Sequence, residues 1–193
     1  MADAPEAPEM PETTPETSPE TTPGTTHHSS PETTPALDAI AESGVLHRVV
    51  RIDPAKSAEE AAEKQGIPLR ALLRTIVVRR GEDDYLFVLV PAGRRFDWPK
   101  LRAHLGISRM SLPDADEALA VTGYVRYTIT PFGSSRPWPV IADAAILNEP
   151  LVAIGGGGFG VNLHLTPADL VATLQAEVVD VTQPESEVPA PRS

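Results

Sequence analysis

Residues 121–133 read Val-Thr-Gly-Tyr-Val-Arg-Tyr-Thr-Ile-Thr-Pro-Phe-Gly, and this stretch says most about the fold and the site. Branched and aromatic residues at 124–130 predict a β-strand, with a glycine before it and Pro-Phe-Gly at 131–133 after it. Glycine lets the backbone approach a ligand closely, and proline fixes the direction of the chain. A second glycine cluster, 155–158 with Gly160, follows. Two such loops on one sheet predict a site that reads its ligand with main-chain groups.

The ends of the chain differ in composition from the middle. Residues 1–35 contain no Leu, Ile, Val, Phe, Tyr or Trp, and the unit Pro-Glu-Thr-Thr-Pro occurs in them three times. Such a segment cannot bury enough apolar surface to offset its ordering entropy, so it predicts a disordered tail. Residues 184–193 predict a second, short tail. The remaining residues, 36–183, have the length of one ordinary domain.

Charge and missing residue types narrow the function classes. Of the net charge of −11, seven acids lie in residues 1–35, which hold no Lys or Arg. Residues 70–109 hold nine Lys or Arg against four acids, an excess that either meets a polyanion or forms a solvated face. The absence of cysteine excludes disulfides, thiol nucleophiles and thiolate metal sites. Without a secretory signal or a long apolar run, the sequence predicts a cytoplasmic protein with no membrane partner.

Local signals predict an α+β fold, with strands paired largely by hairpins and helices packed outside. Ser57 and Glu60 form a capping box for a helix that Gly66 ends. Residues 72–80 and 85–90 predict a β-hairpin. Further helices are predicted at 37–43, 97–105, 113–120 and 167–175, and further strands at 45–52, 140–143, 151–154 and 161–165.

Common motifs for nucleotide binding and nucleophilic catalysis fit poorly. Gly155, Gly157 and Gly160 match G-x-G-x-x-G, but a dinucleotide site needs a helix after the loop. Residues 161–165 alternate like a strand instead. The sequence has no G-x-x-x-x-G-K-[ST] loop and no serine nucleophile elbow, and its five histidines lack metal-ligand spacing.

Arg74 is a cation inside an otherwise apolar strand, Leu-Leu-Arg-Thr-Ile-Val-Val at 72–78. One interpretation is an arginine on the solvent face of a half-buried strand, which strand alternation permits. The other is a cation aimed into a pocket, where it holds a phosphate, a carboxylate or a polarised carbonyl.

In this order and spacing, these residues resemble the YbaK/ProX family of aminoacyl-tRNA deacylases, which is related to the editing domain of bacterial prolyl-tRNA synthetases. The resemblance covers about residues 37–174. It rests on the cation-bearing strand 73–76, on Gly-Tyr at 123–124 with Pro-Phe-Gly at 131–133, on the apolar strand 140–143, and on the glycine turn and last helix at 157–170.

The resemblance implies a mixed, largely antiparallel sheet curled toward a barrel, and a reaction. Such proteins hydrolyse the ester of mischarged aminoacyl-tRNA in trans, without a metal, a cofactor or a covalent protein nucleophile. Main-chain N–H groups polarise the ester carbonyl. The implied partners are the acceptor end of an aminoacyl-tRNA and an aminoacyl-tRNA synthetase, with no DNA.

Site roles follow from the resemblance residue by residue. Catalytic roles fall on Arg74 as the substrate anchor and on Tyr127 and Thr128, whose backbone, with the residues up to Pro131, would face the ester. An aromatic ring is expected to stack on the terminal adenine, from Tyr124, Tyr127 or Phe132. Substrate contacts are expected from Thr75, Gly123, Tyr124, Pro131, Phe132, Gly133, Asp143, Gly155, Gly156 and Gly157.

Three departures from the family pattern fall in this site. Arg74 replaces the usual lysine, and a planar guanidinium is not equivalent to a compact ammonium. Tyr127 and Thr128 replace a Gly-Gly pair, and Gly158-Phe159 replaces a basic pair. The alternative interpretation is therefore a tRNA- or nucleotide-binding module that keeps the fold without turnover.

Overall fold

The computed structural model describes residues 32–185, which form five α-helices, two short 3-10 helices and nine strands. In chain order the elements are α1 (Pro35–Ser43), β1 (Arg48–Arg51), α2 (Ala58–Gln65), η1 (Leu69–Ala71), β2 (Leu73–Gly81), β3 (Asp84–Pro91), β4 (Arg94–Phe96), α3 (Trp98–Leu105), α4 (Ala115–Thr122), β5 (Val140–Asp143), η2 (Ala144–Asn148), β6 (Val152–Gly155), β7 (Val161–Leu165), α5 (Pro167–Leu174), β8 (Glu177–Val179) and β9 (Thr182–Pro184).

The predicted tails fall mostly outside the described residues. At their inner ends, however, Thr34 caps α1, Pro35 begins it, and Pro184 ends β9. The described structure therefore includes a few residues that the sequence assigned to the tails. The division of the chain into tails and one domain otherwise stays a prediction.

The strands form three sheets with mixed pairing. β2 and β3 make the predicted antiparallel hairpin, and β5 and β8 extend it by parallel pairing in the order β2-β3-β5-β8. A second, antiparallel sheet has the order β1-β7-β6, and β4 pairs with β9. A parallel bridge between Leu72 and Ala153 links the first two sheets. The α+β class is confirmed, whereas the curl toward a barrel stays a prediction.

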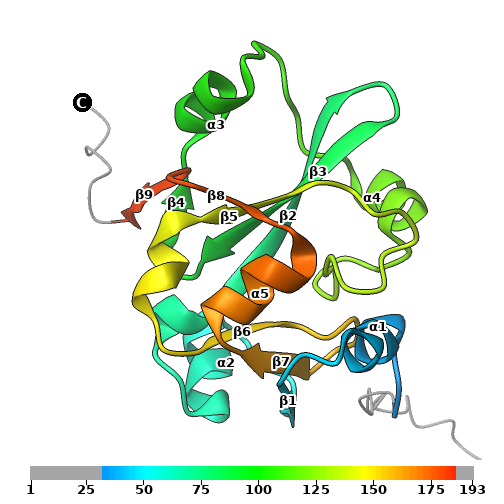
Figure 1. Cartoon of the computed structure of the whole chain (residues 1–193), viewed down its shortest axis with the longest axis vertical. Coiled ribbons are helices and arrows are strands. Elements are labelled where there is room, and N and C mark those ends of the chain that lie inside the picture. Colours follow the sequence, from blue (N-terminus) through cyan, green and yellow to red (C-terminus); the bar gives the residue numbers. More distant parts are fainter. Residues whose placement is uncertain (1–31, 186–193) are drawn as a thin grey trace, which may run out of the picture.

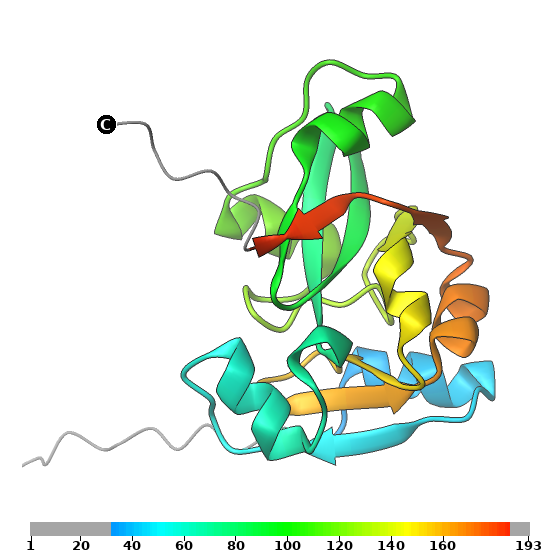
Figure 2. The same ribbon diagram turned by 90° about the vertical axis from the view of Figure 1, so that its left-hand side faces the viewer.

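The main core lies between the two larger sheets. Figure 2 shows the β1–β7–β6 sheet below the longer β2–β3 hairpin. Leu73 and Phe87 from one sheet pack with Ile154 and Leu163 from the other, and α1 adds Ile40. A second cluster on the opposite face of the hairpin lies under α3, so β3 is buried on both faces. This double burial explains its unbroken apolar sequence.

The predicted N-caps form, but in the predicted capping box Glu60 Oε2 accepts from the Lys56 N–H at 2.8 Å and not from the Ser57 N–H. The side chains of Ser57, Asp97 and Thr166 accept hydrogen bonds from the backbone N–H three residues on, at the starts of α2, α3 and α5. Asp114 caps α4 in the same way, so this helix begins two residues later than the sequence suggested. These signals are local, which is why they can be read without knowledge of the tertiary structure.

Candidate active site

The segment after α4 is a loop, and the prediction of a strand at 124–130 is wrong. The loop lies beside α1 in Figure 1. Its backbone is held by side chains, because the Tyr124 N–H donates to Thr122 Oγ1 at 3.1 Å and the Tyr124 hydroxyl donates to the Phe132 carbonyl at 2.7 Å. These bonds give the backbone an alternative to strand pairing. Burial, with a smaller effect from Asp38, raises the pKa of Tyr124 to about 12, so its hydroxyl remains a donor.

A tight turn at residues 125–128 carries Tyr127 on the surface. The Thr128 N–H donates to the Val125 carbonyl at 3.1 Å, and Tyr127 has a φ of +73°. This position of the turn favours glycine, and a left-handed backbone costs another residue about 1–2 kcal/mol. The Tyr127 side chain is 83% exposed, so it does not fill the interior beside the turn.

Several glycines predicted to contact substrate are instead packed against the N-terminal segment. A methyl group built on Gly133 would lie 2.3 Å from the Pro35 carbonyl oxygen, and one on Gly157 would lie 2.8 Å from the Tyr124 ring. The Thr34 hydroxyl donates to the Gly156 carbonyl at 2.5 Å. The sequence predicted close backbone approach correctly, but the approaching group is the start of α1.

Three more predicted contact residues are also enclosed. Tyr124 and Phe132 are each only 4% exposed, which leaves no ring face for a nucleobase in this structure. Asp143 is buried, and its two carboxylate oxygens accept from the N–H groups of Ala145 and Val181 at 3.0 Å. These contacts give Asp143 a structural role, since it joins β5 to η2 and to the segment before β9.

Arg74 lies on a different face from its neighbour Thr75. Leu72 and Ala153, which bridge β2 and β6, pack together in a small cluster under α2. Arg74 is two residues after Leu72, and Gly155 is two residues after Ala153. Because side chains alternate along strands, both positions face the same side as this cluster. Thr75 lies on the opposite face, half-buried, with a buried Oγ1 that makes no hydrogen bond. Arg74 and Thr75 therefore cannot contact the same ligand group.

Gly155 brings the face of Arg74 next to the loop. A methyl group built on Gly155 would lie 3.6 Å from the Ile129 carbonyl oxygen and 4.0 Å from that of Thr128. We call Arg74, Gly155 and the backbone of residues 127–129 the outer face. Of the predicted site residues, the structure thus brings Arg74, Tyr127, Thr128 and Gly155 to one region.

The outer face offers one cation and main-chain donors. The Arg74 side chain is exposed, and its guanidinium donates to the Arg94 carbonyl at 2.5 Å. Within residues 32–185 it forms no ion pair with a carboxylate. In the same range, the N–H groups of Tyr127 and Ile129 donate no hydrogen bond inside the protein. Main-chain donors without a partner and a cation are each suited to an oxygen that gains negative charge.

Two polar positions on this sheet face were missed in the sequence. Asn162 pairs with Gly155 across β6 and β7, and His164 pairs with Ala153, so both side chains share the face of Gly155. Asn162 is half-buried, with its amide donating to the Gly160 carbonyl at 3.2 Å. Only the cross-strand register reveals these neighbours, because the pairing partners of β6 and β7 could not be predicted from the sequence.

His164 belongs to a buried hydrogen-bonded layer behind the outer face. Arg48 Nη2 lies 3.2 Å from His164 Nδ1, and Gln65 Oε1 lies 2.8 Å from His164 Nε2. A guanidinium can only donate, so Nδ1 accepts and the proton sits on Nε2. Burial, followed by the charge of Arg48, lowers the pKa of His164, which keeps the ring neutral.

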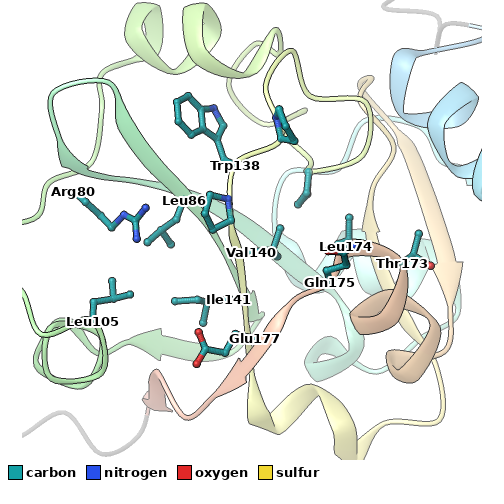
Figure 3. Close-up of a pocket in the computed structure, with 13 residues that line it drawn as sticks. Arg80, Leu86, Leu105, Trp138, Val140, Ile141, Thr173, Leu174, Gln175 and Glu177 are labelled. Carbon is teal, nitrogen blue, oxygen red and sulfur yellow. The ribbon is translucent and has the colours of Figure 1, made fainter.

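A separate cleft of about 550 Å³ opens between β3, β5 and the end of α5. Figure 3 shows Trp138 and Leu86 on its wall and Arg80 and Glu177 at its rim. At its rim Arg80 forms an ion pair with Asp84, and Glu177 Oε1 lies 3.1 Å from His104 Nε2. Among the predicted site residues only Pro131 lines it, so we do not assign the chemistry to this cleft.

The part of the chain from residue 32 to residue 185 contains no group of three or more His, Asp or Glu side chains arranged to hold a metal ion. It also contains no helix that is long and apolar enough to cross a bilayer.

The sequence of residues 52–173 matches the family model described as the aminoacyl-tRNA editing domain. The chain belongs to this family. The matched range includes Arg74, the turn at 125–128 and Gly155, and therefore the whole outer face.

Individual members of the editing-domain family are similar over different shares of their length. A protein of Enterococcus faecalis that carries the provisional name Cys-tRNA(Pro)/Cys-tRNA(Cys) deacylase EbsC is 22% identical over 67% of this chain and 79% of its own. The proline–tRNA ligase of Thermosipho africanus is 28% identical over 52% of this chain but only 18% of its own length. The chain therefore spans only a small part of that synthetase.

A solved structure agrees with the family assignment. A crystal structure described provisionally as a trans-editing enzyme for prolyl-tRNA synthetase superposes with a TM-score of 0.71 and 26% identity. The match covers 77% of this chain and 95% of the other. The likeness thus extends over almost the whole of that fold.

Proposed function

We propose that this chain hydrolyses the ester bond of a mischarged aminoacyl-tRNA in trans, and that residues 36–183 form the editing domain. Membership of the editing-domain family supports the reaction class. The observation that carries the proposal is the outer face, where an exposed Arg74 lies on the same side as Gly155, next to the turn at 125–128. The partners are the acceptor end of the tRNA and an aminoacyl-tRNA synthetase.

The outer face can support hydrolysis without a protein nucleophile. Water adds to the ester carbonyl carbon, and the N–H groups of Tyr127 and Ile129 stabilise the oxyanion that forms. The guanidinium of Arg74 anchors a phosphate or ester oxygen, in exchange for its bond to the Arg94 carbonyl. The bond from the carbonyl carbon to the ribose oxygen then breaks, and that oxygen takes a proton that derives from the water. The products are a free amino acid and uncharged tRNA.

A binding module without turnover is the second candidate. Tyr127 holds a backbone conformation suited to glycine, and Arg74 is held by a carbonyl of β4. Both features are compatible with a domain that retains the acceptor-end site and no longer hydrolyses the ester. A measurement of ester hydrolysis distinguishes the hydrolase from the binding module.

Hydrolysis should be measured with a panel of correctly and incorrectly charged aminoacyl-tRNAs. We expect ester loss above the buffer rate with at least one mischarged species. Arg74→Ala should lower kcat/KM about 100-fold, because it removes a charged anchor from the transition state. Arg74→Lys restores the family's usual residue and should retain activity.

Arg109→Ala is the matched control, since Arg109 is an exposed arginine in the connection between α3 and α4. It should hydrolyse as the wild type does. If Arg74→Ala also keeps the wild-type rate, the anchor role of Arg74 is wrong. tRNA binding without ester loss in any species would favour the binding module.

A further inference from the structure

Tyr127 presents an aromatic ring to solvent at the edge of the outer face. It is 83% exposed, more than any other aromatic side chain among residues 32–185. The guanidinium carbon of Arg126 lies 5.1 Å from the centre of the ring. An exposed ring beside a cation provides a flat surface and a positive charge in one place.

The backbone at Tyr127 makes this exposure unusual. A tyrosine at a φ of +73° is strained, and such strain persists where something offsets it. Burial of the ring does not offset it, since most of the side chain is in solvent. The strained backbone of Tyr127, beside a candidate site, indicates that its side chain makes a contact during function.

We infer that Tyr127 and Arg126 form a stacking platform for an unpaired nucleobase at the 3′ end of an RNA. The inference rests on the proposed function and identifies how that site would hold its substrate. RNA ends are commonly read by stacking on aromatic and guanidinium planes. Tyr124 and Phe132, the other expected stacking residues, are buried, so the platform falls on Tyr127.

The position of the turn fits a base bound there. Tyr127 is two residues before Ile129, whose carbonyl lies next to Gly155. We therefore expect the ribose of a nucleotide whose base stacks on Tyr127 to lie on the side of the outer face. The base contact would set the distance between the ester and the main-chain donors of that face.

The glycine turn between β6 and β7 points to the same kind of recognition. Phe159, in that turn, is 43% exposed where the family resemblance has a basic residue. Tyr127 and Phe159 thus place an aromatic side chain on each of the two loops beside Gly155. Stacking is less sensitive to salt than phosphate contacts are, so the preference for an unpaired end should persist as salt rises.

Two RNA hairpins with the same 5′ fluorophore test the inference by fluorescence anisotropy. One ends in an unpaired four-nucleotide 3′ tail with a terminal adenosine, and the other is blunt. The wild-type chain should bind the tailed hairpin at least about fivefold more tightly. Tyr127→Ala should lose most of that preference, and Tyr127→Phe should keep it. Leu46→Ala removes a side chain that is 86% exposed elsewhere and should behave as the wild type.

Tyr127→Gly separates stacking from damage to the fold. Glycine suits the backbone at this position, so the variant should keep or raise the melting temperature while it loses the preference for the tailed hairpin. If Tyr127→Ala and Tyr127→Gly bind the tailed hairpin as the wild type does, Tyr127 is not a stacking platform. The proposed hydrolysis is not affected by that result. If the wild type neither binds RNA nor hydrolyses any ester, the proposed function fails together with the inference.

Discussion

The loop after α4 has an inner part and an outer part that differ in what their residues do. Gly133 and Phe132, in the inner part, pack against α1 and the main core. Tyr127, in the outer part, faces solvent on a strained backbone, next to the region of Arg74 and Gly155. The inner part follows the family pattern, whereas the outer part departs from it.

We therefore expect agreement with a family pattern and participation in the chemistry to be separate properties. In this chain the Gly-Tyr and Pro-Phe-Gly ends of the loop fold it onto α1. The residues that would touch substrate are the ones that differ, at positions 74 and 127. The substrate or the turnover of this chain should accordingly differ from those of relatives with lysine and glycine there.

The largest expected effect comes from one methyl group on the inner part. Gly133→Ala places a Cβ 2.3 Å from the Pro35 carbonyl oxygen, at a φ of +62°. Backbone on both sides has little room to move, so we expect a loss of about 3 kcal/mol in the free energy of unfolding. Urea unfolding of the full chain measures this loss.

Gly155→Ala is the matched change on the outer face. Its methyl group would lie 3.6 Å from the Ile129 oxygen, an ordinary contact, so stability should change by less than about 0.5 kcal/mol. Hydrolysis should nevertheless fall, since the methyl group projects toward the main chain that would hold the ester. Equal stability losses in the two variants would remove the distinction between the inner and outer parts.

Much of the fold could be predicted because its signals are local. The caps at Ser57, Asp97 and Thr166 and the β2–β3 hairpin depend on residues within a few positions of each other. The predicted strand at 124–130 was wrong because the segment forms a loop that is held by hydrogen bonds between side chains and the backbone. Composition alone does not separate these two outcomes.

The sequence identified candidate site residues but not the face on which each of them lies. Arg74 and Gly155 were expected in the site, and the bridge between β2 and β6 places them on one face. Gly133 and Gly157 were expected to approach a ligand, yet Gly133 lies against the Pro35 backbone and Gly157 lies against the Tyr124 ring and the start of α1. Which group packs against a glycine depends on the tertiary structure, and the spacing of residues in the sequence does not reveal it.

A middle-sized effect should appear in the buried layer behind the outer face. The folded-state pKa of His164 is depressed by burial and by Arg48, so the folded chain binds this proton less readily than the unfolded chain. The stabilising contribution is therefore present above the unfolded pKa of about 6.5 and is lost as the pH falls below it. We therefore expect lower stability at pH 5.5 than at pH 7 from this residue.

Urea unfolding at the two pH values measures that loss. His164→Asn should reduce the difference between pH 7 and pH 5.5, although it lowers stability at both because contacts of His164 are removed. A variant with the full pH dependence of the wild type would show that His164 is not the group responsible.

Thr75 is the residue that the sequence placed beside Arg74 in the site and that the structure turns toward the opposite face. Its hydroxyl is buried without a hydrogen bond, so Thr75→Val should raise the free energy of unfolding by about 1 kcal/mol. Thr130→Val, at the other buried hydroxyl without a partner, is the matched change within the loop and should act in the same direction. Because Thr75 faces away from Arg74, Thr75→Val should hydrolyse aminoacyl-tRNA at the wild-type rate. If Thr75→Val is more stable than the wild type but loses hydrolysis, Thr75 contacts the substrate. The substrate would then not be confined to the face of β2 that carries Arg74.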